Sequence, residues 1–285
     1  MDCRTVASDD AVMVVHAVGT PPEVVVTRFS PEGQPLGAPV NVGVSGLMGV
    51  TKAFGAGCVL PYNEAPYSRL LCFTSAGVTE RALDADGLSF DNELVGSKDR
   101  VIIGGHKWVE ATQQLERAIR AFDERGLVWT RPLRLMSTRS ADGCVLATNP
   151  ETLRSFLLDG STGATLLEFD RVSAGEVTAD WLFVTREEPE GGVLTCLSRE
   201  DGSVRWSTSF KGRRFFARPP LVNGDRVLSF DAKGALVACS VETGDVLAQA
   251  AATDLTALFG VDGLPFVGVT TVRPKEYRFR LYAVR

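Results

Sequence analysis

One histidine lies where it could act as a general base. His106 occupies the stretch Gly104-Gly105-His106-Lys107-Trp108, beside the end of a possible strand, and Asp99 lies a few residues earlier. A histidine base needs a nucleophile and an orienting carboxylate within hydrogen-bond reach. The sequence identifies no serine at the required place. We therefore predict no catalytic residue and expect His106 to have a structural role.

The cysteines and one glycine-rich stretch are the remaining candidates for metal or phosphate chemistry. Cys58 and Cys144 each lie in a Gly-Cys-Val-Leu tetrapeptide, and none of the six cysteines forms a Cys-x-x-Cys pair. Repeated placement favours small buried core residues over disulfides or zinc ligands. Residues 43–52 are rich in glycine but lack the Gly-Lys-Ser/Thr ending of a phosphate loop. We predict neither a metal nor a cofactor.

A hairpin unit recurs along the chain, and its strands and turns determine where any functional residue lies. Its turn glycines are Gly126, Gly163, Gly202 and Gly244, spaced by 163−126 = 37, 202−163 = 39 and 244−202 = 42 residues. Each glycine lies between two short β runs, where it permits a positive φ. Two further β runs precede each hairpin. Four strands in about forty residues are typical of one blade of a β-propeller.

The register predicts an all-β, seven-bladed propeller of four-stranded antiparallel blades, in one domain spanning residues 1–285. Six or eight blades are the alternatives, because the first third of the chain matches the repeat poorly. The last blade has either three strands or a fourth supplied by the N-terminal run 3–7. We assign Leu115 to Phe122 as a strand, although residues 109–122 contain good helix formers and a helical insertion is the alternative. The predicted blades are 3–42, 46–83, 90–133, 135–169, 174–209, 215–250 and 254–285.

The hairpins resemble the repeats of the pyrroloquinoline-quinone (PQQ)-type propeller family. That repeat ends in apolar-Asp-x-x-Thr-Gly-x-x-x-Trp, and its elements lie here at Asp159/Thr162/Gly163, at Asp201/Gly202/Trp206, at Glu242-Thr243-Gly244 and at Asp123/Gly126/Trp129. The resemblance is clear over residues 115–250. It implies that Trp129 and Trp206 dock one blade against the next, at the turn glycines Gly126, Gly163, Gly202 and Gly244.

The same resemblance bears on chemistry. Enzymes of this family hold the quinone with calcium, are typically exported, and have adjacent cysteines above the cofactor. This sequence has no Cys-Cys pair and about half the usual enzyme length. The resemblance therefore implies a non-enzymatic member of bacterial type without a cofactor. Such members serve as docking platforms for other proteins.

Net charge and hydropathy limit the classes of partner that this protein is expected to bind. The formal net charge of −5 argues against a nucleic-acid-binding surface, and no run approaches the roughly 20 apolar residues that span a bilayer. The first residues, Met1-Asp2-Cys3-Arg4-Thr5, do not resemble a secretion signal. We expect a cytoplasmic protein with a protein partner and neither nucleic acid nor membrane.

The stretch from Lys211 to Pro220 is the most suggestive surface segment. It places Lys211, Arg213, Arg214, Phe215 and Arg218 between the last strand of one blade and the first of the next. Arginine and aromatic residues are enriched at interface anchors. These five residues form the predicted partner-binding set. The alternative is that the phenylalanines pack within the blade and the basic groups are hydrated.

The favoured function is a non-catalytic protein-interaction scaffold, or a regulatory or sensor module, that uses the loop face of the propeller. The alternative is a glycosidase-like or lyase-like hydrolase with its active site in the central funnel. Such an enzyme would need paired acids on inner strands. Glu176, in Gly175-Glu176-Val177-Thr178, is the candidate acid, although the sequence shows no convincing second carboxylate.

Overall fold

The computed structural model describes residues 3–7, 12–18, 23–30, 33–45, 52–54, 57–64, 67–74, 77–82, 89–96, 100–123, 125–140, 143–211, 219–230, 235–250, 255–261, 264–273 and 276–283. Every regular element within these ranges is a β-strand, so the predicted all-β class is confirmed. None of these segments is a helix long and apolar enough to cross a bilayer. The chain divides into two compact units, Met1–Leu135 with Asp159–Ala164, and Met136–Leu158 with Thr165–Arg285.

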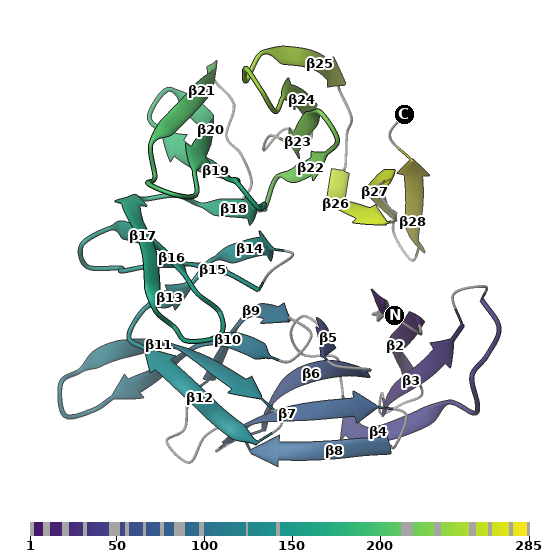
Figure 1. The fold of residues 1–285 in the computed structure, drawn as a ribbon. Coiled ribbons are helices and arrows are strands. Elements are labelled where there is room, and N and C mark those ends of the chain that lie inside the picture. Colours follow the sequence, from purple (N-terminus) through teal and green to yellow (C-terminus); the bar gives the residue numbers. More distant parts are fainter. Residues whose placement is uncertain are drawn as a thin grey trace. The chain divides into compact units, whose positions relative to one another are not determined.

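The first unit consists of antiparallel sheets whose strands follow chain order (Figure 1). Within each of these sheets, strands that are consecutive in the chain pair antiparallel. The sheets contain β1 (Cys3–Ala7), β2 (Val12–Val18), β3 (Glu23–Phe29) and β4 (Val40–Ser45); β5 (Lys52–Phe54), β6 (Gly57–Glu64), β7 (Tyr67–Thr74) and β8 (Gly77–Ala82); and β9 (Ser89–Gly96), β10 (Val101–Val109), β11 (Gln114–Asp123) and β12 (Gly126–Arg131). Strand β13 (Arg134–Leu135) completes this unit.

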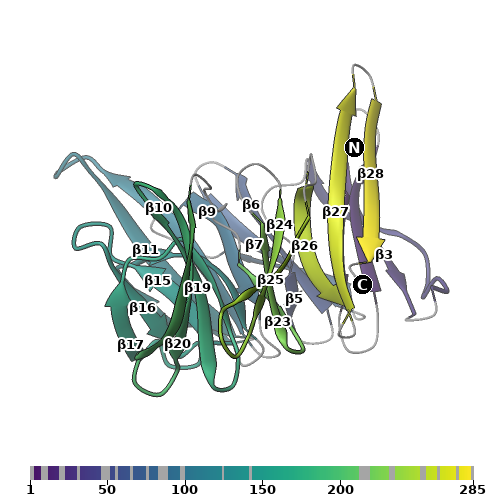
Figure 2. The same ribbon diagram turned by 90° about the horizontal axis from the view of Figure 1, so that it is seen from above.

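The second unit repeats the same local arrangement, and Figure 2 shows its last hairpin, β27–β28, as two long paired strands. The first group is β15 (Val145–Thr148), β16 (Arg154–Leu158) and β17 (Thr165–Asp170). A five-stranded sheet follows, with β14 (Ser137–Ser140), β18 (Ala174–Val177), β19 (Trp181–Glu188), β20 (Gly191–Ser198) and β21 (Val204–Lys211). The remaining sheets are β22 (Leu221–Asn223), β23 (Arg226–Phe230), β24 (Leu236–Ser240) and β25 (Val246–Ala250), then β26 (Leu255–Val261), β27 (Leu264–Arg273) and β28 (Glu276–Ala283).

Two open points of the sequence analysis are decided by the strand pairing. Residues 115–122 lie within β11, between β10 and β12, so the strand assignment is confirmed and the helical insertion is wrong. Pairing on both edges outweighs the local helix propensity. The last described sheet, β26–β28, has three strands, and β1 pairs with β2 of the first sheet. The described strands form seven sheets, while their closure into a seven-bladed ring stays a prediction.

One strand pairing crosses a predicted blade boundary. Ser137–Ser140 lie within the predicted blade 135–169 and pair in parallel with β18 of the following sheet. The Thr138 hydroxyl accepts a hydrogen bond from the Leu146 amide at 3.1 Å and donates to the Met136 carbonyl at 2.9 Å. A side chain thus replaces a backbone partner of β15. The backbone of β14 is then available to β18.

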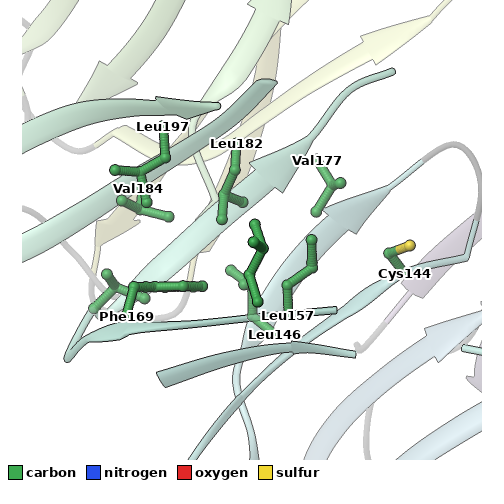
Figure 3. Packing of buried hydrophobic residues seen from close by; sticks show 10 residues of the cluster. Cys144, Leu146, Leu157, Phe169, Val177, Leu182, Val184 and Leu197 are labelled. Carbon is green, nitrogen blue, oxygen red and sulfur yellow. The ribbon is translucent and has the colours of Figure 1, made fainter. Parts of the chain in front are cut away.

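The core of the second unit covers both faces of the β18–β21 sheet. Leu182, Val184 and Leu197 point to one face and pack with β15–β17 residues such as Leu157 and Phe169 (Figure 3). The opposite face carries Phe183, Leu194, Cys196 and Trp206, which pack against Val227, Val237 and Cys239 of the β22–β25 sheet. Two buried faces require continuous apolar runs rather than alternation. This explains the sequence Trp181-Leu182-Phe183-Val184 in β19.

Candidate binding surface

The hairpin turns are held by short polar side chains. Asp159 Oδ1 accepts hydrogen bonds from the Ser161 and Thr162 amides, both at 2.8 Å, and from the hydroxyls of the same two residues. The pKa of Asp159 is lowered, mainly by the hydrogen bond from the Ser161 hydroxyl. In the next repeat, the pKa of Asp201 is lowered to about 2, mainly by the hydrogen bond from the Ser203 amide. Each aspartate is therefore part of the turn and is not available for chemistry.

Two tryptophans lie directly on turn glycines of the following repeat. The Trp206 indole Nε1 donates to the Val241 carbonyl at 2.8 Å, and a Cβ added to Gly244 would meet the Trp206 ring at 2.6 Å. Trp129 donates to the Gly160 carbonyl at 3.0 Å, and a Cβ on Gly163 would meet its ring at 2.7 Å. A tryptophan on an outer strand thus contacts the next hairpin turn, where only glycine leaves room for the ring.

The other two predicted docking glycines have different surroundings. A Cβ on Gly202 would lie 3.7 Å from Leu167, which is an ordinary contact, and nothing lies within 4 Å of a Cβ on Gly126. Gly202 is needed for its φ of +73°, which side chains rarely adopt. The structure therefore brings Gly163 and Gly244 together with tryptophans. The energetic role of all six residues in blade docking remains a prediction.

The two candidate catalytic residues lie on different strands and in different units. His106 is in β10, half-buried and directly opposite Arg117 of β11. Glu176 is in β18, where one carboxylate oxygen accepts a hydrogen bond from the Val222 amide at 3.0 Å. Because Val222 belongs to β22, this bond connects β18 to the first strand of the next sheet. Glu176, the candidate acid of the enzyme alternative, is thus hydrogen-bonded to the backbone of the next sheet.

Three of the cysteines lie within the described side chains, and all three are buried free thiols. Burial raises the pKa of Cys196 and of Cys239 to about 11. A thiol with a raised pKa is a poor nucleophile because little thiolate exists near neutral pH. Cys144 accepts a hydrogen bond from Arg199 at 3.1 Å. These observations agree with the predicted role as core residues.

A groove opens between the β15–β17 strands and the β18–β21 sheet, within the second unit. Its volume is about 360 Å³, and its apolar lining includes Phe169, Val172, Val184, Leu197 and Val204. Several of these residues also belong to the core between the two sheets, so the floor of the groove is rigid. A cavity of this size lies at the lower end of the range for ligand sites, roughly 300–1,000 Å³.

Charged side chains surround the groove. Arg154 bonds Glu168 through Nε at 3.0 Å and Asp170 through Nη1, and Arg186 pairs with Glu188 at 2.8 Å. The Arg154 side chain is 40% exposed and that of Asp170 is 79% exposed. Exposed ion pairs stabilise a protein by only about 0–1 kcal/mol. Charged groups of a partner can therefore replace these pairs at small cost.

Sequence reasoning did not identify this groove. Its charged residues lie on β16, β17 and β19, and the alternation Leu167-Glu168-Phe169-Asp170 was the available signal. In contrast, most of the predicted partner-binding set lies outside the described residues: Arg213, Arg214, Phe215 and Arg218. Lys211 is the last residue of β21, and its side chain is likewise not described.

Comparisons with known proteins agree with this architecture. The family described as outer membrane protein assembly factor BamB matches residues 116–272. BamB from Moraxella catarrhalis is 17% identical with a TM-score of 0.61, covering 93% of this chain and 79% of that chain. Quinohemoprotein alcohol dehydrogenase from Comamonas testosteroni is 12% identical with a TM-score of 0.59, covering 93% and 62%. The computationally designed Ika8 protein is 12% identical with a TM-score of 0.54, covering 98% and 95%.

These likenesses to solved structures are all low in identity and establish the fold alone. A search among curated proteins found no match. The small antiparallel sheets, the repeated hairpins and the solved structures together identify a β-propeller, as the sequence predicted. Because the family match spans more than half of the residues, the chain belongs to the PQQ-like repeat family described as outer membrane protein assembly factor BamB.

Proposed function

We propose that this protein is an interaction scaffold, or a regulatory or sensor module, that binds another protein at its surface. The groove between β15–β17 and β18–β21 carries the proposal. Its floor belongs to a packed core, and its rim presents exposed arginine and carboxylate groups. A preformed surface loses little conformational entropy on binding. The family match to an assembly factor supports a protein partner in general.

The predicted partner-binding set extends this proposal. Lys211 ends β21, the last strand of its sheet, and β22 is the first strand of the next. The sequence between these strands contains Arg213, Arg214, Phe215 and Arg218. We propose that these basic and aromatic residues contact an acidic segment of the same partner. A cytoplasmic location is part of the proposal, and cell fractionation tests it directly.

Site-specific photo-crosslinking in the native source tests the scaffold role. A photoreactive amino acid at Val204, which lines the groove and is 62% exposed, is compared with one at Leu127, which is 56% exposed and does not line it. We expect one protein to crosslink through Val204 but not through Leu127, and the R213E/R214E double variant to reduce its yield. Identical crosslinks from both sites, or none from either, would contradict the proposal.

A further inference from the structure

The groove between β15–β17 and β18–β21 has one wall on which polarity changes in regular steps along the strands. Strand pairing places Leu197 opposite Val204, and Val184 opposite Thr195, so the members of each pair are neighbours on one face. Arg186 follows Val184 two residues further along β19, and all five residues line the groove. Along this wall, a ligand therefore meets apolar side chains first, then a hydroxyl group, and then a guanidinium group.

The middle of this wall suits a peptide backbone better than a hydrocarbon chain. Thr195 Oγ1 and Ser207 Oγ form a hydrogen bond at 3.0 Å, and both residues line the groove. Hydroxyl groups donate and accept, so this pair can bond the N–H or C=O groups of a bound segment. A hydrocarbon chain offers neither a donor nor an acceptor. Phe169 on the opposite wall and Val184 supply the apolar surface (Figure 3).

The two arginines that line the groove differ in how completely their donors are used. Arg154 bonds Glu168 through Nε and Asp170 through Nη1. Arg186 bonds Glu188 through Nη2 at 2.8 Å, and among the described residues its buried Nε has no hydrogen-bond acceptor. A buried donor without an acceptor is unfavourable, and an arginine can bind one carboxylate through two nitrogens. A carboxylate from outside that replaces Glu188 would satisfy both Nη2 and Nε.

The opposite wall determines where an acidic group can bind. Glu168 and Asp170 share the single guanidinium of Arg154, so two negative groups and one positive group leave an excess negative charge there. This charge repels a carboxylate near β17 and favours one at Arg186. In an extended segment, side chains project to the same side every second residue, about 6.6–6.8 Å apart. That spacing matches the two-residue step from Val184 to Arg186.

We propose that the groove binds an extended segment of the partner protein in which one residue separates an apolar residue from an acidic residue. The apolar side chain packs against Phe169 and Val184, and the carboxylate bonds Arg186 in place of Glu188. The Arg186 and Glu188 side chains are 38% and 42% exposed, so separating them costs little. This chemistry of the partner segment rests on the scaffold role proposed above.

Capped peptides test the preference for this segment. The probes are acetyl-Gly-Leu-Ser-Glu-Gly-amide, the same peptide with Gln in place of Glu, and acetyl-Gly-Ser-Leu-Glu-Gly-amide, whose Leu and Glu point to opposite sides. In ¹H–¹⁵N NMR titrations of the full chain, the first peptide should shift signals of β19–β21 with a dissociation constant on the order of 1 mM. The other two should bind about tenfold more weakly or less. Equal affinity of all three, no binding of the first up to roughly 10 mM, or tighter binding of octanoate would overturn the proposal.

Three variants of the protein make the test specific. Glu188→Gln removes the competing charge and should tighten binding of the first peptide about threefold or more, which a folding defect cannot do. Arg186→Lys keeps the charge but loses the paired nitrogens, and should weaken binding about fivefold or more. Arg226→Gln is the matched control, because Arg226 forms an exposed pair with Asp225 and does not line the groove. Unchanged or weaker binding to Glu188→Gln, or equal effects of Arg186→Lys and Arg226→Gln, would refute the assignment of Arg186.

Crosslinking through Val204 separates these outcomes from the scaffold role. If Val204 captures one protein while the peptides show no preference, the apolar-acidic segment is refuted and the scaffold role stands. If the peptides bind as expected while Val204 captures no protein, the scaffold role is refuted and the ligand chemistry of the groove stands.

Discussion

Replacement of Gly244 by alanine tests the contact between outer strand and hairpin turn. Gly244 has a φ of +77°, and an added Cβ would lie 2.6 Å from Cδ2 and Cε3 of the Trp206 ring. The left-handed conformation costs an alanine about 1–2 kcal/mol. Displacement of a packed ring by an extra methyl group costs about 1–3 kcal/mol more. We therefore expect Gly244→Ala to lower the free energy of unfolding by about 2–5 kcal/mol in total.

Gly202 provides a control for the backbone contribution. Its φ of +73° is nearly the same, but the nearest atom to an added Cβ is Leu167 Cδ2 at 3.7 Å. Gly202→Ala should therefore cost only the conformational contribution, about 1–2 kcal/mol. The difference between the two variants measures the clash with the tryptophan ring together with the closer contact to Thr208 Oγ1, which would lie 3.0 Å from the added Cβ.

A double-mutant cycle completes the test. Trp206→Leu copies the natural Leu167–Gly202 arrangement and removes the ring, so Gly244→Ala in that background should lose the ring clash and retain the conformational cost of about 1–2 kcal/mol and the Thr208 contact. The assay is urea unfolding followed by far-UV circular dichroism, with all four variants measured together. Equal costs for Gly244→Ala and Gly202→Ala, or no change in the cost of Gly244→Ala when Trp206 is replaced, would refute the steric argument.

Three further predictions follow from individual hydrogen bonds and pKa shifts. Asp201 should titrate with a pKa of about 2 in the folded protein, so the stabilisation from its hydrogen bonds is complete above pH 4 and is lost as the pH falls through 2. Carboxyl NMR shifts measure this pKa, and a titration midpoint near the ordinary value of 3.8 would contradict the prediction. The pKa values near 11 of Cys196 and Cys239 mean that unfolding releases thiol protons between pH 9 and 11, so the free energy of unfolding should fall as the pH rises through that window. Both thiols should also resist a thiol reagent at pH 8 until urea unfolds the chain. Rapid labelling of the native protein would be inconsistent with burial. Glu176→Ala should lower the free energy of unfolding by about 1–3 kcal/mol because the Val222 amide loses its acceptor. Glu176→Gln retains an acceptor oxygen and should cost less. Thermal unfolding measures both variants, and equal losses would argue against the hydrogen bond.

Much of the architecture could be predicted because the repeat determines it locally. Asp159 and Gly163 illustrate this, since a side-chain acceptor and a positive φ specify the turn without any contact from afar. Residues 115–122 were harder, because their helix propensity and their place in the repeat favoured different structures. The repeat register gave the right answer, since pairing with two neighbouring strands outweighs intrinsic preference.

The rest depends on contacts between residues far apart in sequence. The parallel pairing of β14 with β18 occurs beside a hydrogen bond from the Leu146 amide to the Thr138 hydroxyl, and no sequence periodicity reveals either of them. The groove brings Arg154 and Asp170, which lie opposite each other on β16 and β17, close to Arg186 of β19, and this proximity depends on how two sheets pack.

Hydrogen exchange of the tryptophan indoles tests the central structural claim, that outer-strand tryptophans pack on the following hairpin turn and donate a hydrogen bond to its backbone. Trp129 and Trp206 donate their indole N–H groups to backbone carbonyls, whereas Trp108 is 55% exposed. With ¹⁵N-labelled tryptophan and assignment by single Trp→Phe variants, the indoles of Trp129 and Trp206 should exchange at least a hundredfold more slowly than that of Trp108. Equal, rapid exchange at Trp206 and Trp108 would contradict the account.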